Sequence, residues 1–210
     1  GQGIARLRAA GIAVENGLME AAARELNIGF VSRMTRGTPW LRSKIAASLD
    51  GRTALANGTS QWITGAAARQ DVQHWRARSC AVLTGIGTVL ADDPQLNVRI
   101  DTERQPLRVV LDSTLRMPPA ARMLQSGNVL VCTASRDVGK RAALERQGAE
   151  VLLLADAAGR VDLVAVLHEL ARRGINEVLV EAGRELNGAL LQAGLVDELL
   201  LYLAPQMLGD

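Results

Sequence analysis

A charged and polar set of side chains follows a short apolar run in the first third of the chain. Lys44 precedes the apolar residues 45–47, and Asp50-Gly51 marks a turn on the way to Ser60 and Trp62. Ligands of α/β sheets usually bind beyond the carboxyl ends of strands, so we expect these groups to line a binding site. An ordinary strand followed by a surface loop would have the same local pattern.

A second candidate lies where the apolar run 178–180 meets Glu181. The chain then passes through Gly183 into a helical pattern over residues 185–192, which directs backbone N–H groups and a helix dipole at an anion such as a dinucleotide phosphate. The G-x-G-x-x-G fingerprint is absent, so a plain connection stays open. A carboxylate at the end of an apolar strand is poorly solvated unless it faces a polar cleft, which singles out Glu181.

A third joint, residues 84–87, has two glycines after an apolar run, which allow the backbone to approach a ligand closely. Asp92 and Asp93 either end a helical turn or bind ribose hydroxyls. Arg76 and Arg99 are either surface cations or ligands of a phosphate.

Strand-like and helical patterns alternate from residue 65 onward. The expected strands cover 80–84, 107–112, 128–133, 149–154, 175–180 and 196–203, and the expected helices 65–78, 137–147, 162–173 and 185–192. Repeated βα units predict an α/β fold whose mostly parallel sheet is covered by helices. Earlier in the chain, residues 12–14 have a strand pattern, residues 18–34 have the pattern of one amphipathic helix, and Gly37-Thr-Pro39 indicates a boundary near residue 37.

Composition narrows the class of protein. A chain of 210 residues with 48% hydrophobic content can bury a substantial core. A net charge of +2 and only five aromatic residues argue against a nucleic-acid interface. No long apolar run and no secretory signal occur, so we expect no membrane span and a cytoplasmic location. Two distant cysteines and two histidines predict neither a disulfide framework nor a metal site.

Four blocks, residues 44–54, 60–64, 87–99 and 180–183, closely resemble the reductase domain of the bifunctional riboflavin-biosynthesis deaminase/reductase. The resemblance implies that residues 38–210 have a dihydrofolate-reductase-like fold with a mixed, mostly parallel sheet. It implies NADPH-dependent reduction of 5-amino-6-(5-phosphoribosylamino)uracil to its ribitylamino form, and a homodimer. Residues 1–37 resemble the end of the deaminase domain and its linker helix. The zinc motifs of that domain do not occur, and the reductase domain is expected to be truncated at its C-terminus.

The resemblance also assigns residues to ligands. It places the nicotinamide cofactor against Ala46, Trp62, Thr88, Asp92, Ser113, Gly183, Arg184, Glu185, Leu186, Asn187, Gly188 and Ala189. It places the phosphorylated ribosylaminopyrimidine against Ser60, Arg76, Leu96, Arg99 and Glu181. In the resulting hypothesis Lys44 or a bound water assists proton delivery, while Asp92 and Glu181 orient the reactants. Two alternatives stay open, a dihydrofolate reductase and a nucleotide-binding fragment without turnover, because a fold alone does not separate them.

Overall fold

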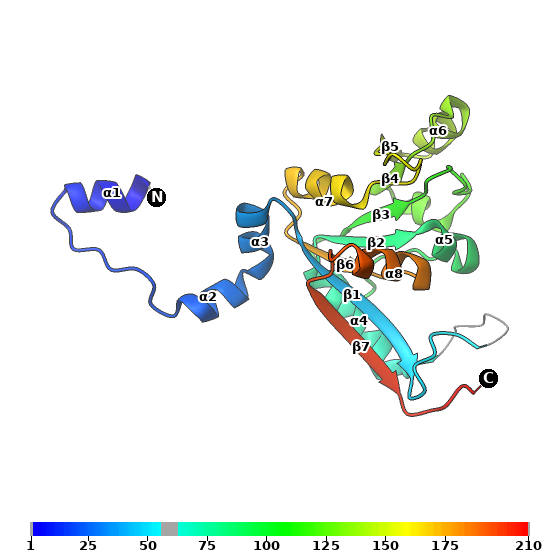
Figure 1. Cartoon of the computed structure of the whole chain (residues 1–210), viewed down its shortest axis with the longest axis horizontal. Coiled ribbons are helices and arrows are strands. Elements are labelled where there is room, and N and C mark those ends of the chain that lie inside the picture. Colours follow the sequence, from blue (N-terminus) through cyan, green and yellow to red (C-terminus); the bar gives the residue numbers. More distant parts are fainter. Residues whose placement is uncertain (1, 56–62, 210) are drawn as a thin grey trace.

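The computed structural model describes residues 2–55 and 63–209, and its centre is a seven-stranded sheet with the order β5-β4-β3-β2-β6-β1-β7 (Figure 1). The strands are β1 (Trp40–Ser48), β2 (Ala81–Gly85), β3 (Leu107–Leu111), β4 (Val129–Thr133), β5 (Ala149–Leu153), β6 (Glu177–Val180) and β7 (Glu198–Ala204). All pairings between these strands are parallel. The predicted α/β class and mostly parallel sheet are therefore confirmed.

Helices cover both faces of the sheet because successive strand residues point to opposite sides. Val82 and its neighbours pack under α5 (Ile86–Asp92), the 3-10 helix η1 (Arg122–Ser126) and α6 (Val138–Glu145). Leu83 points the other way, to α7 (Leu163–Arg172) and α8 (Arg184–Gln192). The longest helix, α4 (Ala66–Arg78), lies against β1 and β7. Two apolar cores thus fix the ends of the strands, where the candidate residues lie.

The N-terminal part differs from the sequence expectation. It contains α1 (Gln2–Ala9), α2 (Glu20–Leu26) and α3 (Ile28–Arg36), and α1 and α2 extend away from the sheet (Figure 1). The strand expected at residues 12–14 is wrong, because these residues have no regular structure and no sheet edge beside them to pair with. The single helix expected over 18–34 is also wrong. Asn27 breaks it by donating its side-chain amide to the carbonyl of Ala23, 2.9 Å away.

Helix α3, in contrast, packs on the amino ends of the strands. Arg33 Nε donates to Asn176 Oδ1 at 2.7 Å, and Arg36 forms an ion pair with Asp197 at 2.6 Å. Gly29 lies so close to the loop before β6 that a Cβ there would be 2.5 Å from Glu177 Cγ and 2.6 Å from the backbone oxygen of Asn176. A glycine is therefore required for this close approach.

Replacing Gly29 with alanine should lower the free energy of unfolding by about 1–3 kcal/mol, because the backbone of Asn176 has to move away from the new methyl group. Urea denaturation followed by circular dichroism measures the change. Gly3→Ala in α1 is the matched control, since no atom lies within 4 Å of its Cβ position and no loss of stability is expected. Equal stability of Gly29→Ala and the unsubstituted protein would contradict tight docking of α3.

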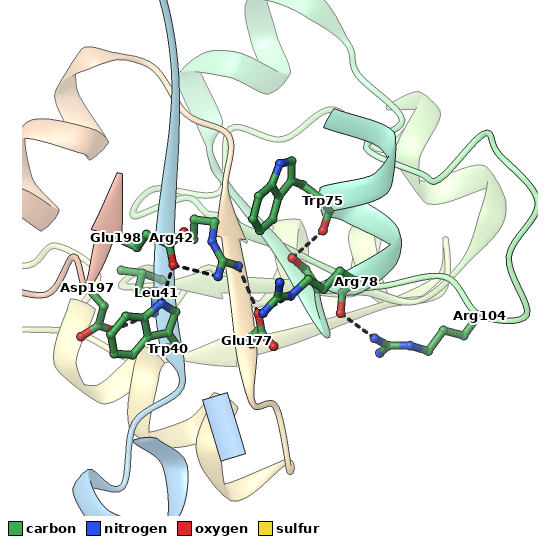
Figure 2. A network of polar contacts seen from close by, with 10 residues as sticks. Trp40, Leu41, Arg42, Trp75, Arg78, Arg104, Glu177, Asp197 and Glu198 are labelled. Atoms are coloured by element: carbon green, nitrogen blue, oxygen red, sulfur yellow. Dashed lines mark hydrogen bonds and ion pairs between the residues drawn. The ribbon is translucent and has the colours of Figure 1, made fainter. Parts of the chain in front are cut away.

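A buried arginine joins α4 to three strands near their amino ends (Figure 2). Arg42 is 2% exposed, and its guanidinium forms ion pairs with Glu177 at 3.1 Å and Glu198 at 2.8 Å and lies 4.4 Å from the Trp75 ring centroid. Burial lowers the pKa of Arg42, but hydrogen bonds and charge from Glu198 and Glu177 outweigh it and raise the pKa. This cluster fixes the position of α4, which carries Arg76 into the candidate site.

Candidate active site

The register of three parallel strands places Lys44 beside Glu181. Ser43 of β1 pairs with Val180 of β6, so the next residue of each strand, Lys44 and Glu181, comes to the same level. Lys44 Nζ lies 3.7 Å from Glu181 Oε2. On the other side of β6, Thr84 Oγ1 of β2 donates to the Glu181 carbonyl at 2.7 Å. Two of the three predicted catalytic residues are thus brought together at the carboxyl edge of the sheet.

Arg76 of α4 completes this cluster with a two-point contact. Its Nε donates to Glu181 Oε1 at 2.5 Å, its Nη2 donates to Oε2 at 3.1 Å, and its Nη1 donates to the carbonyl of Asn97 at 3.0 Å. An arginine guanidinium has five N–H donors and three are used here, so two remain for a ligand. Burial raises the pKa of the Glu181 carboxyl, but the charges and hydrogen bonds of Arg76 and Lys44 hold it below its ordinary value. Glu181 is therefore a buried carboxylate between two cations.

The third predicted catalytic residue, Asp92, lies at the end of the helix that follows β2. Gly85 leads into this short helix, α5, which carries Thr88 in its middle and ends at the exposed Asp92. Beyond α5, residues 93–99 form an irregular segment that includes Leu96 and Arg99. The Leu96 side chain is 4% exposed in the core, so a substrate contact by this residue would use its backbone.

The turn before α8 offers free backbone N–H groups. Gly183 is the N-cap residue with an extended backbone, and no side-chain hydrogen bond caps the helix. Inside α8, the buried Asn187 accepts from Ser43 Oγ at 3.0 Å and donates to the Ala182 carbonyl at 2.9 Å, which ties the turn to β1. An uncapped helix N-terminus next to a glycine suits an anionic phosphate. Arg184 and Glu185 are exposed, Leu186 packs near Gly85, and Gly188 and Ala189 continue the helix.

The remaining predicted residues have separate positions. Ala46 lies on β1 two residues beyond Lys44, and Ser113 follows β3, where its Oγ accepts from the Val161 N–H at 3.1 Å. Ser60 and Trp62 lie outside the described residues. Within residues 2–55 and 63–209, no group of three or more histidine, cysteine, aspartate or glutamate side chains has the arrangement of a metal site. Across the same ranges, no helix has both the length and the apolar character needed to span a bilayer.

Two supporting contacts were missed by sequence reasoning. Asp50 accepts from Ser48 Oγ and from the backbone N–H groups of Leu208 and Gly209 at 3.1 and 3.0 Å. These hydrogen bonds lower its pKa to about 2, and they fix the turn after β1 to the end of the described chain. Gln73 of α4 accepts from the Arg99 N–H at 2.9 Å. Its spacing of three residues from Arg76 places both on one helix face, a signal that the sequence already contained.

Comparisons with known proteins identify the family of the chain. The model of the RibD C-terminal domain matches residues 39–210. The chain belongs to this family. Its relatives include the riboflavin biosynthesis protein RibD of Escherichia coli, 46% identical over the whole chain, and that of Bacillus amyloliquefaciens, 42% identical. The chain spans about 60% of the length of the first and 57% of the second.

Solved structures of the RibD family have the same fold. Acinetobacter baumannii RibD superposes with a TM-score of 0.89 at 47% identity, covering all of this chain and 58% of that one. A Thermotoga maritima structure described as a diaminohydroxyphosphoribosylaminopyrimidine deaminase and 5-amino-6-(5-phosphoribosylamino)uracil reductase gives 0.83 at 30% identity, covering all of this chain and 57% of that one. These matches include residues 1–38, which the family model omits. The division into a deaminase remnant and a reductase domain at residue 37 stays a prediction.

Proposed function

We propose that this chain contains an NADPH-dependent reductase domain that converts 5-amino-6-(5-phosphoribosylamino)uracil to its ribitylamino product. The observation that supports this most strongly is the cluster of Lys44, Arg76 and Glu181 at the carboxyl edge of the sheet, in a chain of the RibD C-terminal domain family. Two cations around a buried carboxylate suit a polar, phosphorylated substrate. In a longer RibD-type protein, this activity would be coupled to a zinc-dependent pyrimidine deaminase.

The residues around α8 and α5 fit a dinucleotide cofactor. The uncapped N-terminus of α8 at Gly183 supplies free N–H groups for a phosphate, and a Cβ added at Gly183 or Gly87 would meet no atom within 4 Å, which leaves space for a ligand. We assign the cofactor to Ala46, Trp62, Thr88, Asp92, Ser113 and residues 183–189. When bound, NADPH supplies the hydride, which is chemistry that no protein side chain provides.

The protein side chains bind, orient and protonate the substrate. We assign the pyrimidine and ribityl chain to Glu181 and the sugar phosphate to Arg76, Arg99, Ser60 and the backbone of Leu96. Lys44, fixed 3.7 Å from Glu181, delivers a proton directly or through a water, while Glu181 and Asp92 orient the reactants. Alignment of two bound reactants can supply about 7–11 kcal/mol of the rate enhancement.

We further propose that the protein works as a homodimer. We also propose a location in the cytoplasm, in line with its two free cysteines. Within the described residues β7 is an edge strand, and one of its faces presents Leu199, Leu201 and Leu203, which are 55%, 54% and 57% exposed. Exposed apolar stripes of this kind commonly mark interaction surfaces. Light scattering should therefore give about twice the chain mass of 22.4 kDa, whereas the chain mass alone would contradict the dimer.

Loss of NADPH absorbance on mixing the chain with freshly prepared 5-amino-6-(5-phosphoribosylamino)uracil tests the proposed function. Dihydrofolate is the parallel substrate. Oxidation with the pyrimidine alone is the expected result, and oxidation with dihydrofolate alone would favour a dihydrofolate reductase. NADPH binding in a titration without oxidation by either substrate would identify a nucleotide-binding fragment without turnover.

A further inference from the structure

The segment between α5 and β3 has an unusual backbone for a region without regular structure. Asp93 and Leu96 have positive φ angles of 40° and 50°, a backbone conformation that residues other than glycine rarely adopt. Residues in such conformations persist only where surrounding contacts over-determine them, and they cluster at functional sites. The contacts that fix residues 93–99 therefore indicate what this segment is built to present.

Hydrogen bonds to residues outside the segment hold it at successive points. The Asp93 carboxylate accepts from the Arg122 N–H at 2.9 Å, and Arg76 donates to the Asn97 carbonyl at 3.0 Å. The amide of Gln105 pairs with both backbone groups of Val98, accepting from its N–H at 2.8 Å and donating to its carbonyl at 3.0 Å.

Gln73 makes the last of these contacts. Its Oε1 accepts from the Arg99 N–H at 2.9 Å, and Gln73 is itself 8% exposed on the buried face of α4. The Leu96 and Val98 side chains point into the core at 4% exposure each, while Arg99 is exposed. The contact thus fixes the backbone of the exposed Arg99. Gln73 lies about one helical turn from Arg76, which binds Glu181.

We propose that Gln73 is a positioning residue that holds Arg99 where its guanidinium binds the phosphate of the substrate. Gln73 and Arg76 extend from one face of α4, so a single rigid helix sets the distance between the phosphate end of the site and the Lys44–Glu181 end. Gln105 also fixes the same segment, through its two hydrogen bonds to Val98. The inference rests on the proposed function, because it assigns the phosphate to Arg99.

Gln73→Met tests the inference, since methionine keeps the length of the side chain and removes the acceptor. The KM for the phosphorylated substrate should rise about tenfold with kcat little changed, the effect of losing one hydrogen bond that orders a binding group. The KM for the unphosphorylated counterpart of the substrate should not change, because Arg99 then has no phosphate to bind. Gln73→Glu, which keeps an acceptor oxygen, should recover most of the loss.

The matched control is Gln70→Met, the same substitution at an exposed position of the same helix, which should leave both KM values unchanged. In an Arg99→Met background, Gln73→Met should have no further effect. Equal increases in KM for both substrates, or additive effects of Gln73→Met and Arg99→Met, would overturn the positioning role. If Gln73→Met does not fold, Gln105→Met is measured instead, because Gln105 holds Val98 next to Arg99. Its KM values for the two substrates, alone and with Arg99→Met, are then judged in the same way.

Binding of ribose 5-phosphate, followed by calorimetry, separates this inference from the proposed function. The protein should bind this probe, and Gln73→Met and Arg99→Met should weaken binding about tenfold each but not cumulatively. This pattern without any NADPH oxidation would support the positioning role and contradict the reductase. Turnover with equal ribose 5-phosphate affinity in the unsubstituted protein and Gln73→Met would support the reductase and overturn the positioning role. The absence of any ribose 5-phosphate binding would also overturn the positioning role.

Discussion

Replacing Lys44 with methionine is expected to lower turnover about 10²–10⁴-fold, the usual contribution of a positioned proton donor or acceptor. Methionine keeps an apolar stem that reaches as far as the lysine Cε, but it lacks the ammonium group, which lies 3.7 Å from Glu181 Oε2. The affinity for NADPH should change little, because the proposed phosphate contacts lie at α8. Steady-state NADPH oxidation and a fluorescence titration of NADPH binding measure the two quantities.

The chain has one other lysine that serves as a matched control. Lys140 is an exposed residue of α6, and Lys140→Met should keep the turnover of the unsubstituted protein. Undiminished turnover of Lys44→Met would remove this residue from the mechanism. A parallel loss of NADPH affinity and turnover would instead indicate that Lys44 serves cofactor binding.

The second large effect is expected for the stability of Glu181→Gln. Removing one partner of a buried ion pair commonly costs about 3–5 kcal/mol, because the remaining charge is left without compensation. Arg76 is 9% exposed and donates to both oxygens of Glu181, so it would be the uncompensated group. Urea denaturation at neutral pH measures the loss in the free energy of unfolding.

An exposed pair provides the comparison for this experiment. Glu150 pairs with Arg173 at 2.5 Å, but its side chain is 55% exposed, so Glu150→Gln should cost less than about 1 kcal/mol. The double substitution Arg76→Met with Glu181→Gln should be less destabilising than Glu181→Gln alone, since it leaves no buried guanidinium. A loss for Glu181→Gln as small as that for Glu150→Gln would contradict the buried pair.

The stability contribution of Glu181 should also depend on pH. The pKa of Glu181 is lowered by folding, so its contribution is complete above the ordinary value of 4.5 and disappears as the pH falls through the folded value. The difference in stability between the unsubstituted protein and Glu181→Gln should therefore narrow below about pH 4.5. A difference that stays constant down to pH 3 would mean that the carboxylate charge is not the source of the effect.

Most of the βα units were predictable because each one depends on local pattern. The helix over 162–173 matches α7 within a residue, since it combines an apolar stripe with the capping Asp162 and is followed by Gly174. The strand over 128–133 matches β4 within a residue, since it is a short apolar run. The N-terminal part lacked such agreement. Its pattern over 18–34 is continuous, yet the side chain of Asn27 bonds to the carbonyl of Ala23 and ends α2, a local competition that periodicity does not report.

The sequence by itself determined that Lys44 and Glu181 stand at the ends of apolar runs, and the resemblance to a known family added Arg76 and Arg99 as candidates. Only the tertiary structure decided which of them meet. The β1–β6 register places Lys44 beside Glu181 although 137 positions separate them in the sequence, and α4 brings Arg76 to the same carboxylate. The contacts that Gln73, Asn187 and Arg42 make with distant parts of the chain also became visible only there. Hydrogen-bond partners far apart in the chain depend on which strands become neighbours and on how helices pack against them, and the local pattern of one segment does not contain this information.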